Sequence, residues 1–296
     1  MLKTFIVSIL VLILNSNSFG QSTEKLNSKF GGVQIGVITY SYRSMPQDLE
    51  SLIQQIKNSG ISAVELMGDP VEIYLGRPSD PESIKKWRST ISMNEFKKVK
   101  KKLNAEGIKI YAYKPNLLNK NSTDEEVEFA MRSAKALGAK SVTTELRVSD
   151  AEHAERLGRI AAKYKMYVGY HNHLQGNDQA WDTALEQNRF NSLNLDCGHY
   201  IAAGGNNTTE SLLAFIDKNH KRISSLHLKD RKNKENGAAN LKWGEGDTPI
   251  KEILLLLKNK KYSIPVTIEL EYKIPAGSDA VKEVKVCMEF AKQILQ

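Results

Sequence analysis

Short apolar runs alternate with amphipathic segments along most of the chain. The runs are rich in β-branched and aromatic residues, which is typical of buried strands. The segments between them repeat apolar residues every three or four positions, which is typical of helices that cover a core. We expect strands at Val33–Thr39, Ala63–Leu66, Ile108–Tyr113, Ser141–Glu145, Met166–His171, Ser192–Asp196, Ile223–Leu228 and Pro265–Glu269.

The amphipathic segments also carry helix start and stop signals. Ser92 with Glu95 has the pattern of a capping box, and Pro249 stands where the first turn of a helix tolerates proline. Gly107 and Gly138 follow helical segments, where glycine commonly ends a helix. We expect helices over residues 48–59, 92–107, 122–138, 150–165, 180–187, 210–218, 250–258 and 278–295.

A strand followed by a helix, repeated eight times, predicts parallel pairing with the helices outside the sheet. Eight such units match a single (β/α)₈ TIM barrel. An open doubly wound sheet is the alternative. That fold usually has a glycine-rich phosphate-binding turn, and the sequence contains no G-x-G-x-x-G or G-x-x-x-x-G-K. Residues 68–90 form a longer connection that we expect near the mouth of the barrel.

The start of the chain has the pattern of a signal peptide. Lys3 precedes the ten-residue apolar run Phe5–Leu14, which is too short to span a bilayer. We expect a cleaved signal peptide at residues 1–20, a linker at 21–32 and the barrel at 33–296, in a periplasmic or secreted protein with no membrane segment after cleavage. An uncleaved N-terminal anchor is the alternative.

Composition and charge exclude several classes of protein. The chain has 296 residues, of which 41% are hydrophobic and 26% charged, so most of it is not intrinsically disordered. The net charge of +8 suggests a nucleic-acid partner only if basic and aromatic residues cluster together, and they do not. Cys197 and Cys287 cannot form a disulfide scaffold or a four-thiolate zinc site, so we expect two buried thiols.

Polar residues gather where the expected strands end, and in a TIM barrel this end carries the active site. Four of the six histidines lie there. The residues are Glu65, Glu145, His171, His173, Asp196, His199, His227, Lys229, Asp230, Arg231, Glu269 and Glu271. Strand alternation allows four of them to converge on the barrel axis: Glu145, Asp196, His227 and Glu269.

Three carboxylates and one imidazole suit a divalent cation such as Mn, Mg, Co or Zn. Without a cation the carboxylates would repel one another, and one would hold a proton. Each residue also has a structural alternative. Glu145 fits an exposed strand end, Asp196 a helix cap, His227 a core histidine, and Glu269 the partner of a nearby lysine or arginine.

The chain resembles the xylose isomerase-like (β/α)₈ superfamily, in particular the sugar phosphate isomerase/epimerase group and its exported Bacteroidetes-type members. The segments that carry the resemblance are YHNH (170–173), NLDCGH (194–199), LHLKD (226–230), WGEGDTPI (243–250) and TIELEY (267–272). The resemblance implies one divalent metal ion, with the ligands Glu145, Asp196, His227 and Glu269. Glu271 is the alternative to Glu269.

The resemblance also implies a sugar isomerase or epimerase with a small carbohydrate as substrate. The metal would hold two adjacent sugar oxygens while Glu145 and Glu269 exchange a proton with carbon. Trp243 would either face a sugar ring or anchor a loop. The other expected substrate contacts are Glu65, His171, His173, His199, Lys229 and Arg231.

Other functions stay open at this point. The same chemistry can end in β-elimination, which would make the protein a carbon–oxygen lyase or hydratase acting on 3-keto sugars or glycosides. An endonuclease-like phosphodiesterase needs more metal ligands than we can place, and a non-catalytic carbohydrate-binding barrel would lose the acid/base pair. An exported enzyme would meet neutral sugars more often than sugar phosphates. The sequence leaves homo-oligomerisation undecided.

Overall fold

The computed structural model describes residues 26–296. The expected signal peptide and residues 21–25 of the expected linker lie outside these residues. Within residues 26–296, none of the helices has the length and apolar character needed to cross a membrane.

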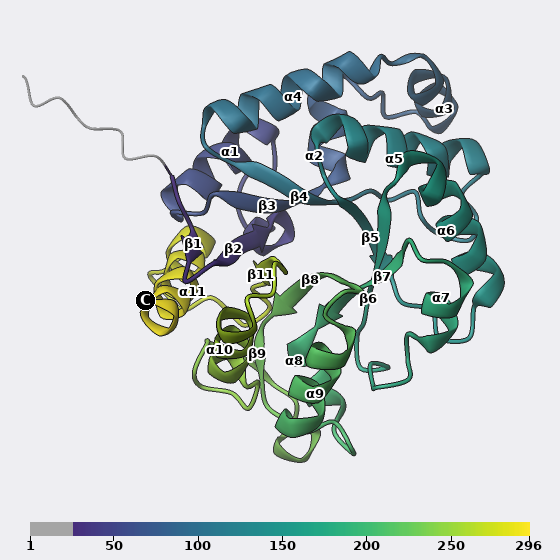
Figure 1. Ribbon diagram of the computed structural model, residues 1–296. Coiled ribbons are helices and arrows are strands. Elements are labelled where there is room, and N and C mark those ends of the chain that lie inside the picture. The colour runs from purple at the N-terminus through teal and green to yellow at the C-terminus, as the bar shows by residue number, and fades with distance from the viewer. Residues whose placement is uncertain (1–25) are drawn as a thin grey trace, which may run out of the picture.

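Eight parallel strands close into a barrel, because β2 pairs with β3 on one side and with β11 on the other (Figure 1). This confirms the prediction of a single TIM barrel, and the predicted strand ends differ from the observed ends by at most one residue. The barrel strands are β2 (Val33–Ile38), β3 (Ala63–Met67), β4 (Lys109–Lys114), β5 (Ser141–Glu145), β6 (Tyr167–His171), β7 (Asn191–Asp196), β8 (Ile223–Leu228) and β11 (Val266–Ile268).

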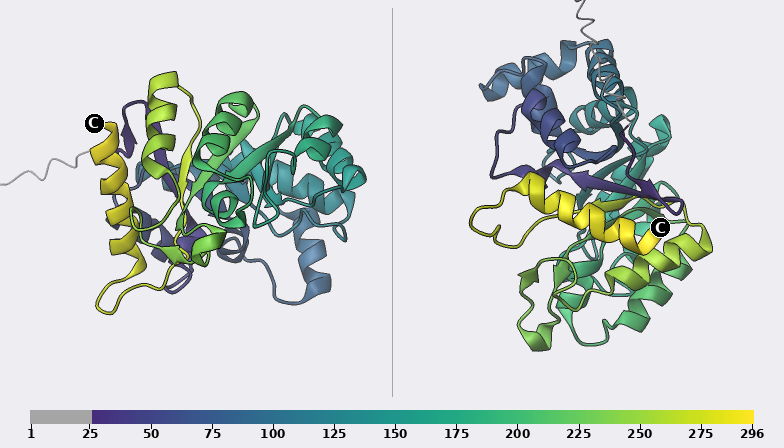
Figure 2. Two further views of the ribbon diagram at one scale, coloured as in Figure 1. Left: turned by 90° about the horizontal axis from the view of Figure 1, so that it is seen from below. Right: turned by 90° about the vertical axis from the view of Figure 1, so that its left-hand side faces the viewer.

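The helices surround the strands, as both views of Figure 2 show. Their apolar faces are buried against the barrel, for example Leu52 and Ile56, which are completely buried. The eight helices predicted from the sequence are present: α1 (Leu49–Asn58), α4 (Met93–Ala105), α5 (Asp124–Leu137), α6 (Ala151–Tyr164), α7 (Asp182–Gln187), α9 (Thr209–Asn219), α10 (Ile250–Lys260) and α11 (Ala280–Leu295).

Side-chain caps fix several helix starts. At α5, Thr123 Oγ1 accepts from the Glu126 amide at 3.3 Å, and the Glu126 carboxylate accepts from the Thr123 amide at 2.9 Å. The capping box expected at Ser92 is not formed, because the Ser92 hydroxyl accepts from the Asn94 amide instead of the Glu95 amide.

Several short elements were not predicted. Lys29 and Phe30 form β1, which pairs antiparallel with β2, and Ser28 is buried against Ser62, so these residues of the expected linker belong to the fold. The other additions are α2 (Gly68–Tyr74), α3 (Pro81–Thr90), α8 (Cys197–Ala203), β9 (Asp230–Arg231), β10 (Asn240–Leu241), and the 3-10 turns η1 (Thr39–Tyr42) and η2 (Lys234–Asn236).

The connection over residues 68–90 packs on the outer helices through α3. The Trp87 and Phe129 rings meet edge to face with centroids 6.2 Å apart, and Phe129 belongs to α5. Arg88 also donates to the buried Glu72 carboxylate of α2 at 2.8 Å. These contacts hold α3 against α5 and α2.

Side chains fill the interior of the barrel below its carboxyl end. The Tyr111 hydroxyl lies 2.7 Å from the Thr267 hydroxyl across the barrel. Gly36 leaves room for the Tyr111 ring, since a Cβ at this position would lie 2.5 Å from Tyr111 Cε1. The barrel interior is therefore a packed core, as is usual for this architecture, in which the functional site lies at the carboxyl ends of the strands.

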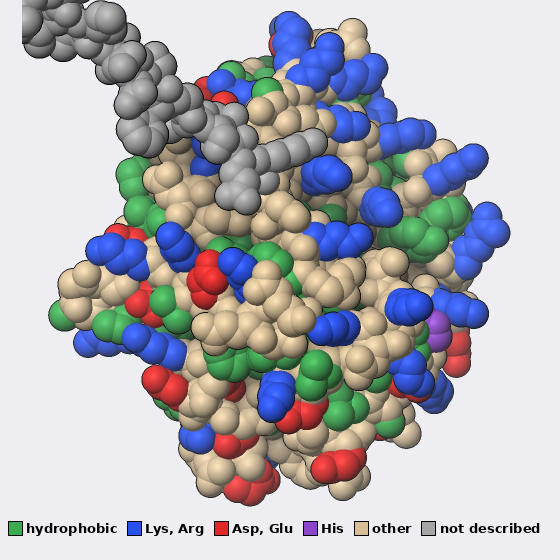
Figure 3. All heavy atoms as spheres, turned by 60° about the vertical axis from the view of Figure 1, so that its left-hand side comes forward, with side chains coloured by type: hydrophobic (Ala, Val, Ile, Leu, Met, Phe, Trp, Pro, Cys, Tyr) green, Lys and Arg blue, Asp and Glu red, His purple; other side chains and the backbone are tan. Residues whose placement is uncertain are grey.

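The surface and the thiols agree with the composition. On the face drawn in Figure 3, lysine and arginine side chains spread widely instead of forming one stripe. Both cysteines, Cys197 and Cys287, are completely buried free thiols, as predicted.

Replacing Thr123 with alanine removes the cap of α5. We expect T123A to lower the free energy of unfolding by about 1 kcal/mol, because the first-turn amides lose their acceptor. T123S keeps the hydroxyl and is the matched control. Urea unfolding followed by circular dichroism measures both, and equal losses for the two variants would contradict the capping role.

Candidate active site

The barrel register brings polar side chains together at the carboxyl ends of the strands. Asp196 on β7 lies beside His227 on β8, and His227 lies beside Thr267 on β11. Glu145, the last residue of β5, pairs with His171, the last residue of β6. These residues are far apart in the chain, and closure of the barrel places them around one axis.

Four side chains form a buried cluster. One nitrogen or oxygen atom from each of His171, Asp196, His227 and Glu269 lies within 4.8 Å of the others. None of the four residues is more than 6% exposed. Two imidazoles and two carboxylates at this spacing match the donor set of a divalent transition-metal ion.

The Lys229 ammonium lies among three carboxylates. Its Nζ is 3.0 Å from Asp196 Oδ2, 2.9 Å from Glu269 Oε2 and 2.8 Å from Glu271 Oε2. Burial would lower the pKa of Lys229, but these carboxylates raise it above its usual value. The contact with Glu271 has hydrogen-bond geometry, whereas Asp196 Oδ2 is buried without a hydrogen-bond partner among residues 26–296.

The two carboxyl groups of the cluster differ in their pKa values. Burial raises the pKa of Asp196 to about 6, although Lys229 opposes this. Burial acts in the same direction on Glu269, but Lys229 and His227 outweigh it and hold the pKa of Glu269 well below its usual range. Asp196 is therefore the carboxyl group that a bound cation would stabilise most in its ionised form.

Glu65 lies beneath His227 and is completely buried. His227 Nε2 is 2.8 Å from Glu65 Oε2, and His227 Nδ1 is 3.0 Å from Glu269 Oε2. Burial disfavours the charged ring, but the two carboxylates outweigh it and raise the pKa of His227 to about 10. If Nδ1 gave up its proton to bind a metal, Glu65 would keep the Nε2 proton in place.

Asn194 fixes the tautomer of His171. The Asn194 amide nitrogen donates to Ser225 Oγ at 2.6 Å and faces Glu65 Oε2 at 3.3 Å, so its oxygen faces His171 Nδ1 at 2.8 Å. A carbonyl oxygen only accepts, so Nδ1 carries the hydrogen and Nε2 keeps a free lone pair. Burial holds the pKa of His171 well below its usual value, and the ring is neutral.

The groups in direct contact at this end carry a net negative charge. Four carboxylates face two cations, which leaves a charge of −2: Glu65, Asp196, Glu269 and Glu271 against Lys229 and His227. Negative charge gathered in one place is unfavourable unless it is offset, and a divalent ion would offset most of it, leaving −1 once His227 has given up its Nδ1 proton. The donor set, the unpartnered Asp196 oxygen and the net charge all fit such an ion.

The open side of the site has a different composition. Lys114 Nζ donates to Glu145 Oε1 at 2.9 Å, and His173 Nε2 lies 3.5 Å from Glu145 Oε2. The Glu145 side chain is 47% exposed and the His173 side chain 56%. Glu145 and His173 are therefore ionisable groups that a dissolved molecule can reach.

A second group, His171, His173 and His199, also has nitrogen atoms within 4.8 Å of one another. His199 Nδ1 accepts from Arg231 Nη1 at 2.5 Å, and burial together with Lys229 and Arg231 lowers the pKa of His199 to about 2. The neutral ring therefore carries its hydrogen on Nε2. This tautomer suits a hydrogen-bond donor to a substrate oxygen better than a metal ligand.

Trp243 packs against α11. It is 7% exposed and packs edge to face on Phe290 of α11, with ring centroids 6.1 Å apart. Asp230 holds the surrounding loop by accepting from the amides of Gly244 at 2.7 Å and Gly246 at 2.9 Å. Of the two roles expected for Trp243, the structure supports the loop anchor.

A family model described as xylose isomerase-like TIM barrel matches residues 53–290, which is most of the chain. The chain belongs to the xylose isomerase-like TIM barrel family. This agrees with the family expected from the strand-end segments. Among curated proteins, none matches the sequence.

Solved structures share the barrel at low identity. A sugar phosphate isomerase/epimerase from Parabacteroides distasonis is 18% identical over 90% of this chain and 96% of its own, with a TM-score of 0.61. The probable 3-DHS dehydratase AsbF from Bacillus anthracis is 15% identical over 87% and 98%, with a TM-score of 0.65. The IOLI protein, solved with a zinc atom, is 15% identical over 89% and 98%, also at 0.65. At these identities the likeness shows the fold alone.

The structure of this xylose isomerase-like barrel places three of the four expected ligands in the buried cluster. Asp196, His227 and Glu269 lie together, but the fourth member of the cluster is His171, because the Glu145 side chain turns toward Lys114 at the rim. Asp196 also caps α8, since its Oδ1 accepts from the His199 amide at 2.7 Å.

The remaining expected residues occupy distinct layers. Glu271 lies at the rim, 25% exposed, while Glu269 is buried in the cluster. Glu65 lies below His227, in a position that orients the imidazole and does not meet a substrate. Arg231 donates to His199 and to the Ala238 carbonyl, so it holds the rim together.

Two residues of the site were missed from the sequence. Lys114 is the last residue of β4, and the strand-end rule that selected the other residues would have found it. Asn194 stands two positions before Asp196 on β7, so alternation places both on the inner face. Its role as the partner of His171 depends on the neighbouring strand, which the sequence does not reveal.

The metal-free protein should lose stability as pH rises from about 7 to 8. The folded pKa of His227 is about 10 against an ordinary value of 6.5, so the folded state binds an extra proton in this range. The free energy of unfolding should fall by roughly 1 kcal/mol per pH unit. E65Q removes one of the carboxylates that raise this pKa, and its slope should be shallower.

Urea unfolding in the presence of a chelator measures these slopes. H220Q, which replaces a histidine outside the site, is the control and should keep the wild-type slope. Identical slopes for E65Q and the wild type would contradict the pairing of Glu65 with a protonated His227.

Proposed function

We propose that this protein is a divalent-metal-dependent sugar isomerase or epimerase that moves a proton through an enediolate. The observation that carries the proposal is the buried cluster of His171, Asp196, His227 and Glu269, in which Asp196 Oδ2 has no hydrogen-bond partner among the described residues. A cluster of this kind at the carboxyl end of a TIM barrel lies where such enzymes carry their chemistry.

The four cluster residues would hold the cation, with His171 in the place expected for Glu145. When bound, the cation would draw electron density from a carbonyl and a neighbouring hydroxyl, which acidifies the adjacent C–H bond. Glu65 and Asn194 keep the two imidazoles in tautomers that can bind it. Two imidazoles favour Mn, Co or Zn over Mg, and zinc in a protein of the same fold agrees with this.

Glu145 and Glu269 would transfer the proton. One carboxylate removes the proton from the carbon next to the carbonyl, and the electron pair of that C–H bond forms the enediolate double bond. A carboxyl group then returns a proton to the opposite face in epimerisation, or to the neighbouring carbon in isomerisation. His199 Nε2–H, His173 and Lys229 are placed to donate to substrate oxygens.

A lyase or hydratase acting on 3-keto sugars or glycosides is the second candidate. It would use the same proton abstraction and then expel a substituent from the β carbon. Lys114, at 2.9 Å from Glu145, supplies a second proton donor on the open side, where a leaving group would need one. A dehydratase among the proteins of this fold is consistent with such chemistry.

Two other candidates have less support. A non-catalytic carbohydrate-binding barrel would have no need of the buried cluster or of the rim carboxylate Glu145. A phosphodiesterase with three metals would need further ligands, and His199 carries its hydrogen on the nitrogen that would have to bind.

We also propose that the protein is exported, on the basis of the pattern in residues 1–20. This location favours a neutral sugar or sugar derivative over a sugar phosphate as substrate.

Metal affinity distinguishes the two possible ligand sets. H171A should raise the Kd for zinc by about 100-fold or more, because it removes a donor from the cluster. E145Q, the matched rim variant, should keep zinc affinity close to wild type and abolish turnover. Calorimetric titration of the chelator-treated proteins measures both. The reverse pattern, in which only E145Q loses zinc, would overturn the His171 assignment.

Solvent deuterium distinguishes the two reactions. The metal-loaded protein should incorporate deuterium at one carbon of a keto- or aldo-sugar from a panel, as measured by NMR, and H227A should not. Loss of a substituent would establish the lyase instead. Absence of both exchange and loss across the panel, with metal bound, would contradict proton abstraction.

A further inference from the structure

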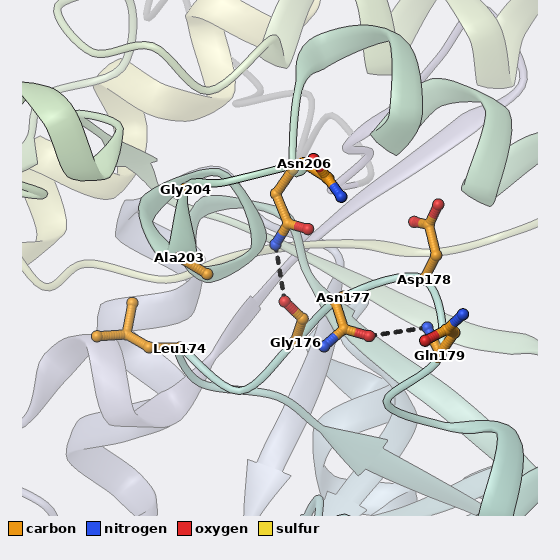
Figure 4. A pocket seen from close by; sticks show the side chains of 9 residues that line it. Leu174, Gly176, Asn177, Asp178, Gln179, Ala203, Gly204 and Asn206 are labelled. Atoms are coloured by element: carbon orange, nitrogen blue, oxygen red, sulfur yellow. Dashed lines mark hydrogen bonds between the residues drawn. The ribbon is translucent and has the colours of Figure 1, made fainter.

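A cavity of about 480 Å³ lies between the loop after β6 and the loop after α8 (Figure 4). The first loop begins directly after His173, and the second follows the short helix that Asp196 caps. The seven residues of α8 span about 10 Å. Leu174, which lines the cavity, directly follows the exposed His173 of the site, so the cavity borders the open side of the site.

Hydrogen bonds fix the two loops to each other and to the site. Asn207 Nδ2 donates to the carbonyls of Gly176 and Tyr200, at 2.8 Å each. The Asp196 amide donates to Asn172 Oδ1 at 2.7 Å, which ties the start of the first loop to the metal cluster. The shape of the cavity thus depends on the same residues that build the site.

The lining is polar and contains no lysine, arginine or histidine. The side-chain amides of Gln179 and Asn206 reach the cavity, and neither makes a hydrogen bond to another of the residues 26–296. Amides present donors and acceptors together, as hydroxyl groups require. Leu174, 52% exposed, adds an apolar surface next to them.

We propose that this cavity is a subsite for a second sugar unit, so that the substrate is a glycoside or oligosaccharide instead of a free monosaccharide. The inference rests on the proposed function for the position of the first unit. Neutral hydroxyls match the free amides, and the C–H face of a ring matches Leu174. The absence of basic side chains from the lining disfavours a phosphate or carboxylate in this position.

Calorimetric titration of the zinc-loaded full-length protein with glucose, galactose, cellobiose, maltose and lactose tests this proposal. At least one disaccharide should bind about 10-fold more tightly than its monosaccharides, since the second unit adds several hydrogen bonds. The double variant Q179A/N206A should remove this advantage and leave monosaccharide affinity unchanged. Q54A/N58A, two exposed amides on α1, is the matched control.

The possible outcomes separate the subsite from the reaction. The subsite would be overturned if disaccharides bound no more tightly than monosaccharides, or if none of these sugars bound. It would also be overturned if Q179A/N206A still bound the disaccharide more tightly than its monosaccharides. If the disaccharide advantage is lost in Q179A/N206A while no sugar exchanges deuterium, the subsite stands and the proposed reaction fails. H227A should abolish exchange without removing the contacts of the second unit.

Discussion

The structure depends on the confinement of buried charge at one end of a closed barrel. The register fixes Asp196 beside His227, and the Glu269 and Glu65 carboxylates both contact the His227 imidazole. Water does not reach them, and their charges must balance locally. Lys229 supplies one positive charge and a protonated His227 another, which still leaves a negative excess that a divalent ion would reduce.

This constraint divides the site into three layers with different tasks. The lowest layer, with Glu65 and Asn194, sets which nitrogen of each imidazole carries a hydrogen. The middle layer is the cluster that would hold a cation. The upper layer, with Glu145, Lys114 and His173, is open to solvent and would meet the substrate. The proposed chemistry at carbon would need an exposed base above a buried electrophile, and Glu145 above a cation in the cluster would supply both.

Periodicity was enough to predict the barrel because each strand and helix carried its own signal, such as the apolar run of Ile223–Leu228. The short helix α8 was missed because it follows β7 without a connecting loop. Asp196, whose sequence context suggested a ligand or a cap, ends β7 and caps α8 in the structure. Most residues of the site could be predicted because they stand at strand ends, and closure of the barrel brings the strand ends together.

The positions of Glu145 at the rim and of His171 in the cluster show where sequence reasoning stops. Both residues end neighbouring strands and are register partners, so alternation alone ranks them equally. The two side chains differ in their hydrogen-bond partners. Glu145 accepts from Lys114 at the rim, whereas His171 Nδ1 donates to Asn194 Oδ1 inside the barrel. Both partners come from other strands, and contacts of this kind become visible only in three dimensions.

X-ray absorption at the zinc edge of the metal-loaded protein tests the central claim most directly, because it counts the imidazoles bound to the ion. The cluster of His171, Asp196, His227 and Glu269 predicts two imidazoles together with oxygen ligands. One imidazole would support the ligand set that contains Glu145. Three imidazoles would place the ion among His171, His173 and His199. Either result would contradict a cation bound by the buried cluster.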